Sequence, residues 1–292
     1  MGSGPLAAQS LEFLSGHFDI ELVITKAKPT WHKDPAPVEV LATQKRIPLA
    51  FANKSSELTK LVVKRQITSK LAIVVDYGVL LSDKVLAKFE RGVINSHFSL
   101  LPEWRGADPI TFALLSGQHF TGVSVMLVDH GLDTGQLLIS KKVTISDQET
   151  NGSLTTKLVK TSNDLLLATI NKWLNGTAKS HQQSDAPITY STKVDKAAGK
   201  IDWNKPASFL AREVLAYSDW PQSWFVLGDL KIFIKQAKAV DRPLKIGQIK
   251  QIDNSLFAGC RLGTLELLKL KPAGKKTMAA KDFINGYGRY LG

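Results

Sequence analysis

Two polar side chains that can do acid–base chemistry lie two residues apart, at the end of an apolar segment. Asn95 and His97 follow Val93 and Ile94 in the sequence. Because side chains alternate along a β-strand, we predict that Asn95 and His97 point to the same face. An imidazole with an ordinary pKa near 6.5 exchanges protons around neutral pH, and an amide donates a hydrogen bond to a developing oxyanion.

A carboxylate that could act with this pair follows further along the chain. Asp133 lies in the turn-rich segment Asp129–Gly135, after another apolar run. A carboxylate beside an imidazolium holds that ring in place, or it orders a water that relays a proton. Each residue alone also has a purely structural interpretation. His97 could be a structural residue whose hydrogen bonds are made within the fold, Asp133 could form an Asx turn, and Asn95 could cap a loop. Together the three residues favour acyl transfer to an amine, a reaction with a tetrahedral oxyanion.

The elements that must position these groups alternate between strand and helix patterns in the first half of the chain. Such alternation favours an α/β fold with an open, mostly parallel sheet covered by helices. Continuous apolar runs such as Leu71–Val75 are typical of strands buried on both faces. The predicted strands are Ile20–Thr25, Leu71–Val75, Val93–Ser96, Val123–Val128 and Leu137–Ile145. The predicted helices are Ala36–Gln44, Asp83–Glu90, Asp108–Ser116 and Ser153–Asn175.

The second half of the chain has a different pattern. A polar segment, residues 176–187, predicts a linker, so we expect domains at 1–175 and 188–292. After the linker, Lys205–Tyr217 predicts a helix. The short strands that follow predict a small barrel or sandwich. They are Ser223–Val226, Asp229–Val240, Ile246–Ile252 and Thr264–Lys271.

Positive charge is concentrated in this second half. The chain has a formal net charge of +12. Residues 188–292 hold 18 Lys and Arg against 9 Asp and Glu, a net charge of +9. The net charge favours a polyanionic partner, either nucleic acid or an anionic membrane. A small basic β-barrel favours nucleic-acid binding, with a solvated basic face as the alternative.

Composition also limits the cellular setting. The single cysteine, Cys260, excludes an internal disulfide and argues against a Cys-based zinc site. It is expected to be a packed thiol, and the absence of disulfides fits a reducing cytoplasm. No apolar run reaches the roughly 20 residues of a membrane span. We therefore expect a cytoplasmic protein without a membrane partner.

The motif around the pair closely resembles a family of formyltransferases that use 10-formyltetrahydrofolate. It reads Asn-x-His-x-Ser-Leu-Leu-Pro, with an Asp 36 positions after the His in Gly-Leu-Asp-Thr-Gly. The resemblance implies a Rossmann-like sheet, no metal, and catalytic roles for Asn95, His97 and Asp133. It also implies folate contacts from two loops and a nearby carboxylate. These residues are Ser99, Leu100, Leu101, Pro102, Tyr77, Gly78 and Asp129.

The downstream half resembles the members of that family that formylate methionyl-initiator tRNA. The matching segments include Ile201-Asp202-Trp203, residues 220–224 and residues 270–278. The resemblance implies an OB-like β-barrel that helps to hold tRNA, in agreement with the charge count. A shortened basic loop, Thr25–Pro37, is expected to approach the acceptor end, with a mobile surface loop as the alternative. The expected tRNA contacts are Lys26, Lys28, Trp31, Lys33, Arg105, Lys275 and Lys276.

The start of the sequence departs from the family pattern. Met1 stands where the first strand of such a sheet ends, and Gly2–Pro5 forms the following turn. We therefore expect the first strand to be missing, through a misplaced start or a truncation, which would leave an open sheet edge. We expect a monomer. The alternative functions are formylation of an amino sugar nucleotide or of glycinamide ribonucleotide, and RNA binding without efficient catalysis.

Overall fold

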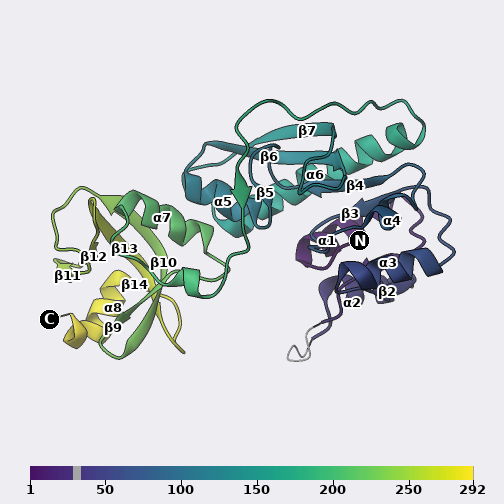
Figure 1. The fold of residues 1–292 in the computed structure, drawn as a ribbon. Helices are drawn as coiled ribbons and strands as arrows, with labels where there is room; N and C mark the ends of the chain where they lie inside the picture. Colours follow the sequence, from purple (N-terminus) through teal and green to yellow (C-terminus); the bar gives the residue numbers. More distant parts are fainter. Residues whose placement is uncertain (29–33, 292) are drawn as a thin grey trace. The chain divides into compact units, whose positions relative to one another are not determined.

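The structure is a computed structural model that describes residues 1–28 and 34–291. The chain forms two compact units. The first contains Met1–Pro109, Phe120–Thr144 and Thr155–Ser191, and the second contains Ile110–His119, Ile145–Leu154 and Thr192–Gly292. The candidate site lies entirely within the first unit, whose sheets and helices are drawn in purple to teal in Figure 1.

A four-stranded sheet forms the centre of the first unit, in the order β3-β4-β6-β7. Its strands are β3 (Ala72–Val74), β4 (Val93–His97), β6 (Phe120–Leu127) and β7 (Leu137–Thr144). Only β3 and β4 are parallel, because β6 runs antiparallel to β4 and β7 runs antiparallel to β6. The prediction of a mostly parallel sheet is therefore wrong. The nine residues between β6 and β7 are a short connection, which suits antiparallel neighbours.

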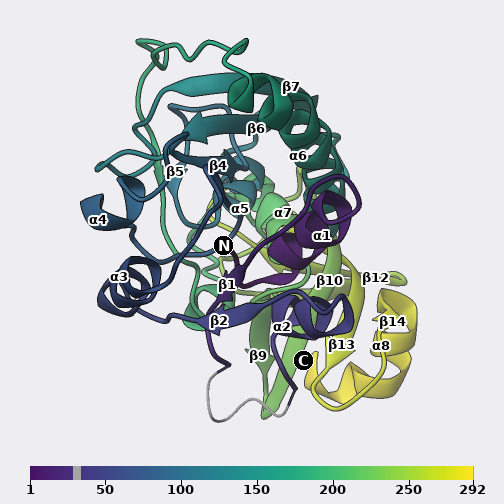
Figure 2. The same cartoon turned by 90° about the vertical axis from the view of Figure 1, so that its right-hand side faces the viewer.

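Helices cover this sheet where apolar residues recur at helical spacing. Leu154, Leu158 and Leu166 of α6 (Asn151–Leu174) are fully buried, and the hydroxyls of Ser162 and Ser96 hydrogen bond, which holds α6 against β4. Figure 2 shows α6 running beside β6 and β7. The predicted helices are confirmed within a few residues at their ends. The other helices of the first unit are α1 (Pro5–Leu14), α2 (Pro37–Gln44), α3 (Ser55–Lys64) and α4 (Asp83–Leu86), whereas α5 (Pro109–Ser116) belongs, except for its first residue, to the second unit.

Three further strand pairings complete the first unit. β1 (Val23–Thr25) pairs in parallel with β2 (Leu49–Phe51), apart from the four-stranded sheet. β5 (Arg105–Gly106) pairs in parallel with β8 (Tyr190–Ser191). His181 forms an isolated bridge with Leu137. The bridge shows that part of the predicted linker is attached to the sheet.

The first residues lie between β1 and β3. The Gly2 amide donates to the carbonyl of Ile24, while the Met1 amine donates to Ile73 and the Val75 amide donates to Met1. No other strand of the described residues joins β1 to β3. Beside these residues lies a mainly apolar cavity of about 340 Å³, lined by residues that include Leu14, Val23 and Ala72.

A curled antiparallel sheet, in the order β11-β12-β13-β10-β9 with β14 on β13, forms most of the second unit. Its buried face packs against α7 (Ala207–Ala216) and α8 (Ala280–Tyr287), with Leu210 and Phe283 fully buried. Figure 1 shows α8 beside this sheet. Cys260 is buried, which raises the pKa of its thiol to about 11 and agrees with a packed thiol. The strands are β9 (Trp224–Leu227), β10 (Leu230–Val240), β11 (Ile249–Ile252), β12 (Ser255–Gly259), β13 (Thr264–Pro272) and β14 (Met278–Ala279). Two 3-10 helices, Ala197–Gly199 and Gly288–Tyr290, complete the elements.

Candidate active site

The pair Asn95 and His97 lies on β4, between β3 and β6. Val93 and Ile94 are almost fully buried, so the first part of the strand is anchored in the core and its end carries the polar groups. His97 is itself buried, with 6% of its surface exposed, and Asn95 is partly exposed. The strand therefore presents its imidazole in a largely water-excluded setting, where electrostatic interactions are stronger than in water.

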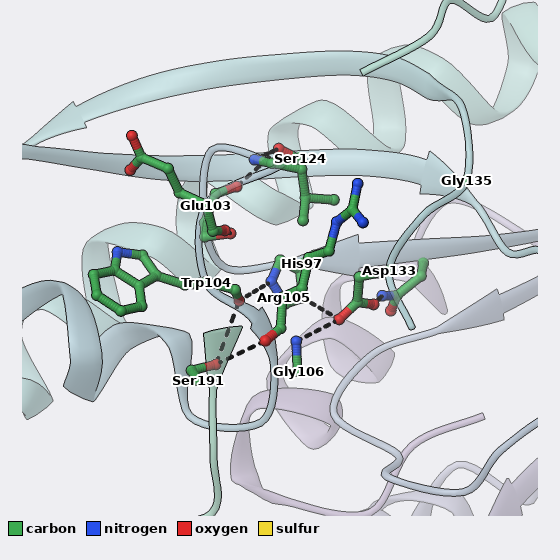
Figure 3. Close-up of polar contacts among 12 residues, drawn as sticks. His97, Glu103, Trp104, Arg105, Gly106, Ser124, Asp133, Gly135 and Ser191 are labelled. Carbon is green, nitrogen blue, oxygen red and sulfur yellow. Dashed lines mark hydrogen bonds and ion pairs between the residues drawn. The ribbon is translucent and has the colours of Figure 1, made fainter. Parts of the chain in front are cut away.

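A backbone carbonyl selects the tautomer of His97. Nε2 of the ring lies 2.8 Å from the carbonyl oxygen of Trp104, which can only accept a hydrogen bond. The neutral ring therefore carries its proton on Nε2 and has a free lone pair on Nδ1. Figure 3 shows His97 between the Trp104 carbonyl and the carboxylate of Asp133. Nδ1 lies 3.6 Å from Oδ2 of Asp133, so the basic nitrogen faces a carboxylate.

The backbone around Asp133 aims this carboxylate at the pair. Asp133 has a φ of 53°, in the left-handed region that aspartate tolerates better than most residues. Its Oδ2 accepts a hydrogen bond of 2.8 Å from the backbone N–H of Gly106, and its Oδ1 lies 3.5 Å from Nδ2 of Asn95. Asn95, His97 and Asp133 thus meet at one place, although 38 residues separate the first from the last.

This arrangement supplies the groups that acyl transfer to an amine requires. The lone pair on Nδ1 of His97 can take a proton, and Asp133 would stabilise the resulting imidazolium. The long contact between Asn95 and Asp133 leaves the amide N–H groups available for a better acceptor, such as an oxyanion. The arrangement therefore suits a reaction in which an amine loses a proton while a carbonyl oxygen gains charge.

The loop of residues 99–102 is fixed beside the site by Ser124 of β6. The Ser124 hydroxyl donates to the carbonyl of Ser99 at 2.8 Å and accepts from the N–H of Leu101 at 3.0 Å. Ser99, Leu101 and Pro102 are buried, while Leu100 is partly exposed and packs where Gly122 leaves room. A ligand at this loop would meet mainly its backbone and the exposed part of Leu100.

The other predicted folate residues have side chains with structural partners. Tyr77 is 2% exposed and its hydroxyl donates to the carbonyl of Ala52. Burial, and then the charge of Glu57, raise the pKa of Tyr77 to about 12. Oδ1 of Asp129 accepts from the N–H of Gly131 and from the hydroxyl of Thr134. Gly78 has a φ of 60° and lies against Lys26, so Gly78 and the backbone near it are the parts of this loop open to a ligand.

The carboxyl of Asp76, beside Tyr77, has a raised pKa. Its Oδ2 lies close to the backbone of Gly4. Desolvation raises its pKa to about 6, with the charge of Lys26 opposing and that of Asp108 adding to the shift.

The predicted tRNA contacts are found in different settings. Lys26 is partly exposed and Lys28 is exposed, whereas Trp31 and Lys33 lie outside the described residues. Lys275 and Lys276 are exposed on the connection between β13 and β14, in the second unit. Arg105 is 8% exposed and its Nη2 donates to Oε1 of Gln183. It faces the interior of the site, which does not suit contact with an exposed backbone phosphate.

Four contributors to the site escaped the sequence analysis: the Trp104 carbonyl, the Gly106 amide, Ser124 and Gln183. Two of them are backbone groups, which every residue of this kind has, so the sequence does not show which ones take part. Ser124 is the one polar side chain in the run Val123–Leu127, and that interruption is a signal that the sequence analysis could have used. Gln183 lies in a polar segment without any pattern.

Two classes of feature are absent from residues 1–28 and 34–291. No group of three or more His, Cys, Asp or Glu side chains there is arranged to hold a metal ion. No helix in the same ranges is long and apolar enough to cross a bilayer.

The mixed α/β sheet, with an amide, an imidazole and a carboxylate converging near the end of β4, defines a candidate group-transfer enzyme. Comparison with known families agrees with this class. A family described as "Formyl transferase" matches residues 9–170, and a second, "Formyl transferase, C-terminal domain", matches residues 193–288. The chain therefore belongs to the formyl transferase family, and formyl transfer is its class of reaction.

Solved structures with similar folds include several formyltransferases. An N-formyltransferase from Helicobacter canadensis, in complex with folinic acid and dTDP-3-aminofucose, is 18% identical with a TM-score of 0.66. The match covers 91% of this chain and 96% of that one. HypX from Aquifex aeolicus, in complex with tetrahydrofolic acid, is 15% identical with a TM-score of 0.59, over 86% of this chain and 44% of that one. At these identities the likeness shows the fold.

A phosphoribosylglycinamide formyltransferase from Bacillus halodurans is 26% identical, with a TM-score of 0.50. The match covers 59% of this chain and 91% of that one. The names of these similar proteins point to more than one kind of acceptor, an amino sugar in one and a glycinamide in another. The acceptor of this chain therefore has to be inferred from its own residues.

Proposed function

We propose that this protein is a methionyl-tRNA formyltransferase, which transfers the formyl group of 10-formyltetrahydrofolate to the α-amine of methionyl-initiator tRNA. The observation that carries the reaction is the convergence of Asn95, His97 and Asp133, with Nε2 of His97 against the Trp104 carbonyl and Nδ1 3.6 Å from the Asp133 carboxylate. Support for the donor comes from the folate ligands of the similar folds.

The reaction follows from these groups. The amine nitrogen attacks the formyl carbon, and Nδ1 of His97 takes the proton that the amine loses. Asn95 donates a hydrogen bond to the oxyanion of the tetrahedral intermediate, while Asp133 stabilises the imidazolium. The bond between the formyl carbon and N10 then breaks, and tetrahydrofolate leaves with a proton from His97. An α-amine with a pKa near 7.7 has about one-sixth of its molecules unprotonated at pH 7. Help from a general base should therefore be modest, and positioning should supply much of the rate.

The choice of tRNA as acceptor rests on the second half of the chain. Residues 188–292 carry a net charge of +9, which suits a polyanion. Lys275 and Lys276 extend into solvent from the curled sheet that we interpret as the OB-like barrel of a tRNA-binding domain. The domain limits at 175 and 188, a monomeric state, cytoplasmic location and the folate and tRNA contacts named above all remain predictions.

An amino sugar nucleotide is the second candidate acceptor. It is favoured by the N-formyltransferase complexed with dTDP-3-aminofucose, whose fold matches over nearly the whole of both chains. A nucleotide sugar carries only two phosphates and gives no reason for a strongly basic second half. We therefore place it after tRNA.

One assay separates the candidates. The protein is incubated with 10-formyltetrahydrofolate and, in parallel, with charged initiator tRNA, a dTDP-amino sugar or glycinamide ribonucleotide. We expect formylmethionine only in the first reaction. Formylation of the sugar without formylation of the tRNA would replace the proposal with the second candidate. Failure of every acceptor, with RNA binding retained, would favour an RNA-binding protein.

A further inference from the structure

Part of the predicted linker is bound to the loop that carries Asp133. The N–H of Leu137 donates to the carbonyl of His181 at 2.8 Å, and the N–H of His181 donates back at 2.9 Å. The hydroxyl of Ser180 donates to the side chain of Gln136. The segment 180–183 therefore runs along the residues that follow Asp133, and it is a fixed part of the first unit.

Gln183 uses both ends of its amide at this place. Its Nε2 donates to the carbonyl of Asp133 at 2.7 Å and to the carbonyl of Gly135 at 3.0 Å. Its Oε1 accepts from Nη2 of Arg105 at 2.7 Å. One side chain thus joins the turn that carries the carboxylate to the strand β5, whose Gly106 amide binds that same carboxylate.

The turn at Asp133 needs such support. A non-glycine residue in the left-handed region costs roughly 1 kcal/mol or more, and it persists only where surrounding contacts hold it. Gly135 allows the close approach, because a Cβ there would collide with the carbonyl of Leu127. With the carbonyls of Asp133 and Gly135 bound to one amide, the turn has little freedom to rotate the carboxylate away from His97.

Gln183 also provides a hydrogen-bond acceptor for the buried side chain of Arg105. The Arg105 side chain is 92% buried, it forms no ion pair with a described residue, and its Nε has no hydrogen-bond partner among them. The amide oxygen of Gln183 is the partner that the structure gives this guanidinium. A buried cation with so few partners is free to donate to an anionic or carbonyl oxygen that enters the site.

We propose that Gln183 is a positioning residue for formyl transfer, which holds the carboxylate of Asp133 against His97 and Gly106. The inference rests on the proposed function, since it assigns Gln183 a role in that same reaction. The two bonds to the loop carbonyls carry this role, and the bond to Arg105 secures the other end of the amide.

Gln182 provides a matched control. It is the same residue type in the neighbouring position, it is exposed, and the structure gives it no hydrogen bond. Gln183→Met keeps the length of the side chain and removes its donors and acceptor. Gln183→Glu keeps an acceptor for Arg105 but opposes the two loop carbonyls with a charged oxygen.

Steady-state and single-turnover rates of formyl transfer test the proposal. Because a displacement of about 1 Å can cost about 100-fold in rate, we expect kcat to fall about 10- to 100-fold in Gln183→Met and in Gln183→Glu. The KM for 10-formyltetrahydrofolate should change less than about threefold, and Gln182→Met should match the wild type. A kcat for Gln183→Met within about threefold of the wild type would overturn the proposal, as would full activity of Gln183→Glu.

A double mutant shows whether Gln183 acts through Asp133. In an Asp133→Asn background, Gln183→Met should lower kcat by less than about twofold, because the charge that it positions is already gone. Independent, multiplying losses would show that Gln183 supports some other part of the protein, and would overturn the assignment.

Hydrogen exchange separates this inference from the proposed function. Gln183→Met should speed amide exchange in residues 129–136 and at Gly106, while Gln182→Met should not. If the wild type formylates none of the acceptors but exchange rises as expected, the proposed function fails and the positioning of the loop stands. Unchanged exchange in active protein would overturn the positioning role alone.

Discussion

Asp133→Asn is the substitution that tests the candidate site most directly. Asparagine keeps the shape of the side chain, and its Oδ1 can still accept from the N–H of Gly106, so the turn should survive. What changes is the charge beside His97, where Oδ2 now lies 3.6 Å from Nδ1. The substitution therefore removes the partner of the imidazolium that forms as the amine loses its proton.

The size of the effect follows from that distance. Two unit charges 3.6 Å apart attract by about 5 kcal/mol at an effective dielectric constant of about 20. Because Asp133 keeps 14% of its surface exposed, solvent screening reduces this figure, and we take it as an upper limit. About 3 to 4 kcal/mol corresponds to a fall in kcat of about 100- to 1,000-fold.

The assay follows transfer of labelled formyl from 10-formyltetrahydrofolate to the acceptor, in single-turnover experiments at saturating donor. Asp164→Asn is the matched control, because Asp164 is an exposed residue of α6 without a hydrogen bond in the structure. Its rate should equal that of the wild type, and both variants should keep the wild-type Tm within a few degrees. An Asp133→Asn enzyme within about fivefold of the wild-type rate would refute the electrostatic role of the carboxylate.

Three further outcomes are expected. Ser124→Ala removes the two hydrogen bonds that fix the loop at Ser99 and Leu101, so the KM for the folate donor should rise about 5- to 10-fold with kcat nearly constant; a fall in kcat alone would contradict this. Burial raises the pKa of Glu213 against the opposing hydrogen bond from Lys205. The folded state thus holds this proton more tightly, and stability should be lost as the pH rises from about 4.3 through the raised pKa. Glu213→Gln should therefore gain in Tm relative to the wild type as the pH rises from the ordinary glutamate pKa through the raised one, and parallel curves would contradict the burial effect. Replacing Lys275 and Lys276 by alanine should weaken tRNA binding and lower its log–log salt slope by up to about one unit per lost phosphate contact, whereas an unchanged slope would remove them from the interface.

Secondary structure could be predicted where a segment has a long, clear period or a continuous apolar run. The helix predicted at Ser153–Asn175 is α6, and the buried strand predicted at Leu71–Val75 contains β3. Helices α1, α3 and α8 were not predicted, although Leu58, Leu61 and Val62 of α3 recur at helical spacing, a signal that the sequence analysis did not use. Strand β12 was missed because its five residues, Ser255–Gly259, form only a short segment between turn residues.

Local sequence patterns could not predict the direction of the strands or the packing of the polar segment, residues 176–187. A buried strand has the same apolar character whether its neighbour runs parallel or antiparallel, so the prediction of a mostly parallel sheet did not foresee that β6 runs antiparallel to β4. Residues 176–187 have no apolar period, and they are nevertheless attached through His181 and Gln183 by hydrogen bonds that composition does not reveal.

The sequence by itself determined which chemical groups are available, in what order, and on which local elements: an amide and an imidazole two apart on a strand, a carboxylate in a turn, and a basic second half. Tertiary structure decided how those groups work together. Only folding brings the Trp104 carbonyl to Nε2 of His97, the Gly106 amide to Asp133 and Gln183 to the turn 50 residues before it. These contacts are directional hydrogen bonds, mostly between distant residues and often made by the backbone. Their existence depends on positions within a few tenths of an ångström, which no residue type or spacing specifies.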